Sequence, residues 1–206
     1  MTNEEYNLKV YWDMFRHTYG LDKLSRYQED LFWDEARKQR EWCWYSDSPE
    51  YAITEAFLFD KPAMLEKWWK NLSFEDKQKY LIYTWLAKGS AILLGYNWWV
   101  DKFKQVGYLT NTEIKYEEIG PITLYRGSLP NLKVGMSWTP KVEFANLFKN
   151  QYQESKIYMI KAEPSDILGI MEGGAQEIDG EIHRGIEYVL DTHKLDGRIE
   201  ELVNPL

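Results

Sequence analysis

The chain has 206 residues, with 25 lysines and arginines against 33 aspartates and glutamates and a formal net charge of −8. This length allows one ordinary domain, or a compact catalytic module with a helical extension. The 44% hydrophobic and 28% charged residues argue against wholesale disorder and fibrous repeats. The acidic balance argues against binding nucleic acid by phosphate neutralisation, which needs a surplus of Lys and Arg on one face.

Metal, disulfide and membrane signals are weak. A single cysteine, Cys43, cannot form an internal disulfide, and the three histidines lack the spacing of a zinc site. The first residues lack the basic and then apolar order of a signal peptide, and no window approaches 18 uninterrupted apolar residues. We therefore expect a cytoplasmic protein that has no metal site and no contact with a membrane.

The aromatic residues divide the chain into two parts. Of the 33 aromatics, 25 lie in residues 1–110, including nine of the ten tryptophans. Residues 1–110 carry a net charge of −2 (15 basic against 17 acidic), and residues 111–206 carry −6 (10 against 16). We expect a Trp-rich helical region at 1–112 and a second domain at 113–206.

The first part has helical periodicity. Residues 4–19 place large apolar side chains at steps of three and four, and residues 22–45 have the pattern of a half-exposed helix. Ser46–Pro49 breaks this pattern. Asp60 before Lys61-Pro62 predicts a cap and a short helix, and Ser73 with Asp76 resembles a capping box that opens a long helix.

The tryptophan pairs at 68–69 and 98–99 have two interpretations. Their faces could stack on a base or a sugar. Tryptophan at helical spacing among Leu and Ile more often fills a core or a helix interface. The sequence favours the core.

From Ile114 onward, short β-rich runs alternate with Gly, Pro and Asn, which is typical of strands and turns. The segment 172–181, rich in glycine and acidic residues, reads as a loop. The expected elements are strands at 122–127, 135–140, 157–162 and 185–190, and a helix at 142–148. Together the two parts predict an α+β protein.

Polar side chains fall on three of these strands: Arg126, then Ser137 with Thr139, then Glu187. An arginine at a strand end can bind an anionic group, and a hydroxyl can orient a neighbouring side chain. A carboxylate can stabilise positive charge that develops on a sugar carbon. The set suits a substrate that carries phosphates and a ribose.

The sequence motifs around these residues are more specific than their spacing. Tyr-Arg126-Gly127, then Ser137-Trp-Thr139 followed by a helix, then Glu187-Tyr-Val-Leu, resembles the Arg-Ser-Glu class of ADP-ribosyltransferases, which includes phage and toxin members. The resemblance covers residues 115–195. It implies a split β-sandwich that grips NAD+, and a mono-ADP-ribosyltransferase of the phage or bacterial effector type, acting in a host cytoplasm if phage-encoded.

The resemblance also implies a role for each residue. Arg126 would hold the NAD+ phosphates, and Gly127 would let backbone groups approach the nicotinamide carboxamide. Ser137 would orient Glu187 and bound NAD+, with Thr139 supporting the same strand. Glu187 would hydrogen-bond the ribose 2′-hydroxyl and stabilise the oxocarbenium-like cation as nicotinamide leaves.

One position departs from the family pattern. Arginine-modifying members carry Glu or Gln two residues before the catalytic glutamate, and here that residue is Gly185. Gln176, Glu177 and Glu181, in the nearby predicted loop, are the other candidates for this role, so the acceptor stays open. The alternatives are an NAD+ glycohydrolase and a non-catalytic binding or inhibitor protein that retains the fold. The balanced charge of residues 1–110 favours a protein target over nucleic acid.

Overall fold

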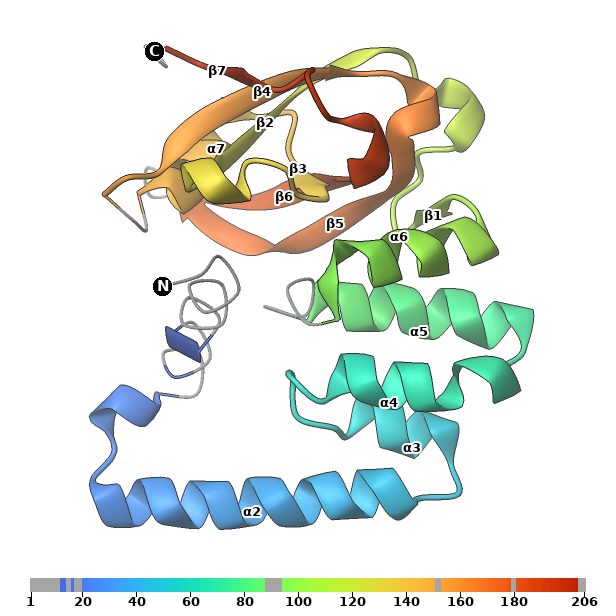
Figure 1. The fold of residues 1–206 in the computed structure, drawn as a ribbon, viewed down its shortest axis with the longest axis vertical. Coiled ribbons are helices and arrows are strands. Elements are labelled where there is room, and N and C mark those ends of the chain that lie inside the picture. Colours follow the sequence, from blue (N-terminus) through green and yellow to red (C-terminus); the bar gives the residue numbers. More distant parts are fainter. Residues whose placement is uncertain are drawn as a thin grey trace. The chain divides into compact units, whose positions relative to one another are not determined.

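The structure is a computed structural model that describes residues 12, 13, 16, 20–87, 94–150, 153–178 and 181–203. The chain forms two compact units, Met1–Gly95 and Tyr96–Leu206 (Figure 1). The division lies earlier than the boundary predicted after residue 112, because the helix and the short strand that precede that residue belong to the second unit.

The described part of the first unit is helical. Its elements are η1 (Leu21–Lys23), α2 (Arg26–Tyr45), α3 (Pro49–Thr54), α4 (Lys61–Trp68), η2 (Trp69–Asn71) and α5 (Phe74–Leu86). Of the helix predicted at 4–19, Trp12, Asp13 and Arg16 are helical, and the other residues up to Tyr19 lie outside the described part. None of the described helices is both long enough and apolar enough to cross a membrane.

The helix starts follow local capping chemistry. The hydroxyl of Ser25 accepts from the Gln28 N–H while the Gln28 side chain accepts from the Ser25 N–H, so α2 begins four residues later than predicted. The N–H of Asp76 donates to Ser73 Oγ, which confirms Ser73 as the cap of α5. The Asp76 carboxylate accepts from the Ser73 hydroxyl and not from the Ser73 N–H, so the predicted capping box is incomplete. Asp60 stands at the predicted start of α4 but makes no side-chain cap; its carboxylate accepts from Arg40 Nε instead.

The helical unit buries only part of its aromatic surface. Fully buried side chains come from each of the four longer elements: Cys43, Ile53, Leu65 and Leu81. Trp69 and Trp85 are buried with them, whereas Trp42 and Trp44 are exposed. Of the two predicted pairs, Trp69 and Trp99 are buried, as the core interpretation requires, whereas Trp68 and Trp98 are only half-buried.

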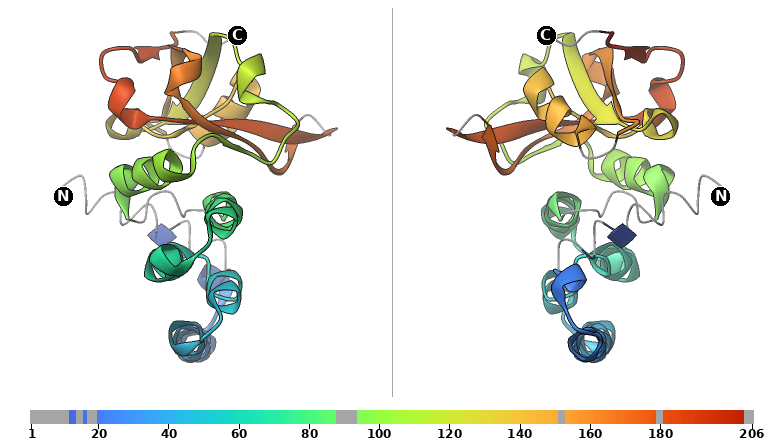
Figure 2. Two further views of the ribbon diagram at one scale, coloured as in Figure 1. Left: turned by 90° about the vertical axis from the view of Figure 1, so that its right-hand side faces the viewer. Right: turned by 90° about the vertical axis from the view of Figure 1, so that its left-hand side faces the viewer.

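The second unit combines two helices with two sheets, so the predicted α+β class is confirmed. Its elements are α6 (Gly95–Val106), β1 (Leu109–Thr110), η4 (Tyr116–Glu118), β2 (Ile122–Ser128), η5 (Pro130–Leu132), β3 (Ser137–Trp138), α7 (Val142–Lys149), β4 (Lys156–Ala162), η6 (Pro164–Asp166), β5 (Ile167–Ile178), β6 (Glu181–Leu190), η7 (Thr192–Lys194) and β7 (Glu200–Glu201). One sheet has the order β1-β5-β6-β3 and the other β2-β4-β7. Figure 2 shows the ribbon in two further views.

The strands β5 and β6 form a long antiparallel hairpin where the sequence predicted a loop. The prediction of a loop at 172–181 is wrong, because β5 continues to Ile178 and pairs with β6 from Glu181 onward. The glycines 173 and 174 lie at a register shift between Glu172 and Ala175. They serve as a bulge, which interrupts the ladder without ending the strand.

The core of the second unit lies against one face of the β5–β6–β3 sheet. Its buried cluster includes Trp138, Tyr188, Ile170 and Leu124. Trp138 is almost fully buried in this cluster. Leu124 is the core residue of β2, and side chains alternate along a strand, so half-buried Tyr125 points to the other side.

Candidate functional site

Strand β3 lies where the two sheets meet. On one side, Ser137 pairs with Val189 of β6. On the other side, Thr139, just past β3, exchanges two backbone hydrogen bonds with Tyr125 of β2, at 2.7 and 2.9 Å. The strands that carry Arg126 and Glu187 are therefore both connected to the Ser137–Thr139 segment.

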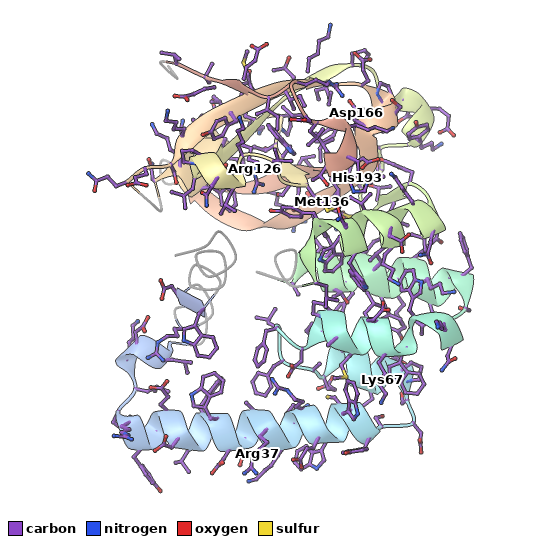
Figure 3. All side chains as sticks on the ribbon, in the orientation of Figure 1. Arg37, Lys67, Arg126, Met136, Asp166 and His193 are labelled. Atoms are coloured by element: carbon purple, nitrogen blue, oxygen red, sulfur yellow. The ribbon has the colours of Figure 1, made fainter. Side chains whose placement is uncertain are left out.

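The guanidinium of Arg126 is held by the loop that leads into β3. Its Nη1 donates to the carbonyl of Ser137 at 2.8 Å, and its Nε donates to the carbonyl of Leu132 at 3.4 Å. A Cβ on Gly135 would lie 2.5 Å from Arg126 Cζ and from Nη2, so a side chain here would displace the guanidinium. Figure 3 labels Arg126 among the strands of the second unit.

Arg126 keeps donors for a ligand. A guanidinium has five N–H donors in a planar fork. The two described hydrogen bonds engage Nε and Nη1 and leave Nη2 without a described acceptor. A half-buried arginine that is fixed on one side and has donors to spare on the other suits an anion such as a phosphate.

Glu187 reaches the site through the pairing of β3 with β6. Directly opposite residues of an antiparallel pair share a face, so Ser137 lies on the face of Val189, and so does Glu187 two residues along β6. Such diagonal neighbours are about 7–8 Å apart. Trp138 and Tyr188 pair on the opposite, core face, where burial raises the pKa of the Tyr188 hydroxyl. The half-buried Glu187 is thus on the face away from the core.

Gly127 permits a close approach of helix α7 to β2. A Cβ there would lie 2.0 Å from the carbonyl oxygen of Ala145 and 2.6 Å from the N of Lys149. Backbone groups of a strand alternate sides, so the N–H and C=O of Gly127 point the same way as those of Tyr125, toward the Thr139 side. Gly127 therefore has a packing role on one side and presents backbone groups beside Arg126 on the other.

Position 185 is covered by an aromatic ring. A Cβ on Gly185 would lie 3.0 Å from Cε1 and 3.2 Å from Cδ1 of Phe144, which is buried in α7. Gly185 and Glu187 alternate onto one face of β6. An apolar ring therefore covers the position two residues before Glu187 on that face. Gln176, Glu177 and Glu181, the other candidates for this place in the sequence, belong to the far half of the hairpin.

Two buried acidic residues of the second unit, Asp166 and Asp191, form ion pairs near the ends of the strands. Burial by itself would raise the pKa of Asp166, but hydrogen bonds from Arg198 and from the Glu163 N–H outweigh it, and the pKa is lowered. Asp191, also buried, pairs with Lys104 of α6 at 2.8 Å. These ion pairs connect η6, η7 and α6 to the sheets. They do not belong to the candidate site around Ser137.

The structure thus brings together Arg126, Gly127, Ser137 and Thr139 on adjoining segments, and places Glu187 on the face of Ser137. Sequence reasoning missed two contributors, Gly135 and Phe144. From the sequence, Gly135 was expected only to begin a strand, and Phe144 only to lie in a helix. Their roles are contacts across the fold, which no local pattern encodes.

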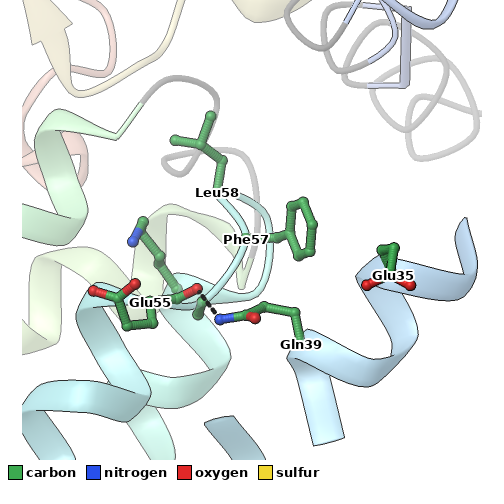
Figure 4. Close-up of a pocket in the computed structure, with 7 residues that line it drawn as sticks. Glu35, Gln39, Glu55, Phe57 and Leu58 are labelled. Carbon is green, nitrogen blue, oxygen red and sulfur yellow. Dashed lines mark hydrogen bonds between the residues drawn. The ribbon is translucent and has the colours of Figure 1, made fainter. Parts of the chain in front are cut away.

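A separate hollow of about 480 Å³ lies in the helical unit, between α2 and the loop before α4 (Figure 4). The Gln39 amide donates across it to the Glu55 carbonyl at 2.9 Å. Lys61, which also lines it, already donates to the carbonyls of Ile53 and Thr54 and to the Tyr83 hydroxyl. Its cation is therefore satisfied within the protein. Within the described ranges, no group of three or more His, Cys, Asp or Glu side chains could hold a metal ion.

Comparison of the chain with protein-family models, with curated proteins and with solved structures found no match. The functional assignment therefore depends on the residues and geometry described above.

Proposed function

We propose that the protein is a mono-ADP-ribosyltransferase that transfers ADP-ribose from NAD+ to a macromolecular target. The nearly balanced charge of residues 1–110 favours a protein over a nucleic acid as this target. The observation that carries the proposal is the junction at β3, where Arg126 donates to the Ser137 carbonyl while Ser137 and Glu187 share a face. Two sheets that are bridged by backbone hydrogen bonds at this segment support an ADP-ribosyltransferase-like split β-sandwich.

The residues present fit NAD+ as substrate. The spare donors of Arg126 suit the pyrophosphate, because guanidinium and phosphate form charge-assisted hydrogen bonds. The N–H and C=O of Gly127 can donate to and accept from a carboxamide, the reactive end of nicotinamide. Ser137 and Thr139 supply hydroxyls on the face of Glu187.

The reaction breaks the bond between ribose C1′ and the nicotinamide nitrogen, and its electron pair leaves with neutral nicotinamide. Glu187 accepts a hydrogen bond from the ribose 2′-hydroxyl and stabilises the positive charge on the sugar. The acceptor's nucleophilic atom then bonds to C1′ and loses its proton. A carboxylate placed where charge develops contributes about 3–4 kcal/mol, by analogy with the loss of one preorganised donor.

The contact between Gly185 and Phe144 bears on the acceptor. An arginine acceptor needs a polar group near Glu187 to bind and deprotonate its guanidinium, and this place holds a buried ring. The contact favours an acceptor other than arginine. It also favours a second candidate function, transfer to water by an NAD+ glycohydrolase, because water needs no acceptor-binding group.

Labelled NAD+ incubated with the protein and a cell lysate tests the proposal. Glu187→Gln should lose about 10²–10³-fold in NAD+ consumption and keep its fold. Glu200→Gln, at an exposed carboxylate of β7, is the matched control and should behave as wild type. Label on a discrete band that the Glu187 variant loses supports transfer, and free ADP-ribose without labelled protein supports hydrolysis. Absence of consumption by the wild type overturns both.

A further inference from the structure

The outer face of α2 carries a stripe of exposed apolar side chains. Tyr27, Leu31, Trp42 and Tyr45 are exposed by 72%, 48%, 58% and 80%. At 100° per residue they fall within about 60° of one another on the helical wheel, along about 27 Å of the helix. We call these four residues the α2 stripe.

The stripe is opposite the face that α2 uses within its own unit. Ala36 and Cys43 are buried on the inner face, and Arg40 on that face pairs with Asp60. Trp33, also inward, stacks on Trp12 with ring centroids 5.4 Å apart. The inner face of α2 thus packs within its own unit, and the α2 stripe lies on the opposite, outward face.

The stripe has an internal two-fold pattern. Its apolar residues lie at the two ends of the helix, and exposed Asp34 and Lys38 lie between them on the same side. When two such helices run antiparallel about an axis beside residue 36, Tyr27 faces Tyr45 of the second copy. Asp34 then faces Lys38 of the second copy, twice per pair. A surface that matches itself under a two-fold rotation is the requirement for a symmetric dimer.

We propose that the α2 stripe binds a second copy of this chain, as an antiparallel pair of α2 helices. The charges agree with this occupant, since α2 carries four basic and five acidic residues and has little net charge to repel its copy. Asp34 and Lys38 now pair with Arg37 and Glu35 of their own helix, at 3.1 and 2.7 Å. Such exposed pairs contribute little and can exchange partners.

The available area indicates a reversible dimer. An aromatic side chain buries about 150–250 Å² when fully covered, so at these exposures each of the three aromatic residues of the stripe offers roughly 100–180 Å², and Leu31 offers less. Two stripes then bury roughly 700–1,200 Å², near the lower limit of specific interfaces. The inference is independent of the proposed function, because it uses no residue of the second unit.

Sedimentation velocity of the full chain over roughly 1–100 μM tests the proposal. We expect a dimer that dissociates on dilution. Asp34→Lys sets two lysines against each other, and Lys38→Asp sets two aspartates against each other, so each should weaken the dimer about tenfold. The double variant Asp34→Lys/Lys38→Asp has the wild-type composition and should restore dimerisation. Leu31→Glu should remove the dimer.

Asp196→Lys, an exposed change of equal charge in the second unit, is the matched control and should leave the dimer intact. Far-ultraviolet circular dichroism of every variant excludes loss of helix as the cause. A wild type that stays monomeric throughout overturns the proposal. A dimer that Leu31→Glu leaves unchanged also overturns it, because the α2 stripe is then not the interface. Single charge reversals that weaken the dimer and are not rescued by the double variant overturn it too, because the antiparallel register is then excluded.

Discussion

The Nη1 of Arg126 donates a 2.8 Å hydrogen bond to the backbone carbonyl of Ser137. The contact joins β2, a strand of one sheet, to β3, a strand of the other. It fixes one side of the guanidinium through main-chain atoms and leaves the Ser137 hydroxyl for other contacts. The position of Arg126 therefore depends on the loop from Leu132 to Ser137, and this loop can be altered without changing Arg126.

Gly135→Ala should displace the Arg126 guanidinium, because the new Cβ would lie 2.5 Å from its Cζ. The end of a flexible side chain can move aside, so we expect little change in thermal stability. Loss of a charge-assisted hydrogen bond should weaken NAD+ binding by roughly 10–100-fold. Calorimetric titration with NAD+ measures this. Gly120→Ala, where a Cβ meets open space, is the control, and wild-type affinity in Gly135→Ala would contradict the assignment of Arg126.

Gly127→Ala should destabilise the second unit. Its Cβ would lie 2.0 Å from the Ala145 carbonyl, and a helix backbone, unlike a side-chain end, cannot move aside without losing its packing. Overpacking of this kind costs about 1–3 kcal/mol. Urea unfolding gives the free energy. Gly173→Ala, whose Cβ would meet its nearest neighbour at an ordinary 3.6 Å, should be much milder, and equal stabilities of the two variants would disprove the close approach.

Asp166→Asn should lower the free energy of unfolding at pH 7 by about 2–3 kcal/mol, since it breaks a largely buried pair with Arg198. The pKa of Asp166 is lower in the folded protein than its ordinary value of about 3.9. The contribution of the Asp166 carboxylate to the free energy of unfolding is thus fully present above its ordinary pKa, and it is lost as the pH falls through the lowered pKa. The difference between wild type and variant, measured by unfolding at several pH values, should shrink below about pH 4.

The exposed Asp196→Asn variant is the control for that series, and should follow the wild type at every pH. A difference between wild type and Asp166→Asn that persists unchanged into acid would mean that the ion pair with Arg198 is not its source.

Gly185→Ala should cost about 1 kcal/mol, because its Cβ would press on the Phe144 ring at 3.0 Å. In a Phe144→Leu background the ring is absent and the cost of the alanine should fall. Residues in contact show coupling of at least about 0.5 kcal/mol in a double-mutant cycle. Urea unfolding of the four proteins measures the coupling. Additive effects would show that the ring does not cover position 185.

The sequence by itself determined the elements whose signals are local. Caps such as Ser73 act on backbone groups within one turn, and the alternating run around Arg126 defines β2 from neighbouring residues alone. The α+β class and the Arg126, Ser137 and Glu187 candidates followed from such runs. The second half of β5 escaped prediction because its glycines and acidic residues have weak strand propensity, and only pairing with β6 makes that segment extended.

Only the tertiary structure decided how these elements meet. The bridge between Tyr125 and Thr139, the fit of Gly135 under Arg126 and the ring of Phe144 over Gly185 join residues that are 9 to 41 positions apart in the chain. Such contacts arise when separate segments pack to a common density, so each depends on the volume and backbone course of its partner. A periodicity read along one segment contains no information about the other.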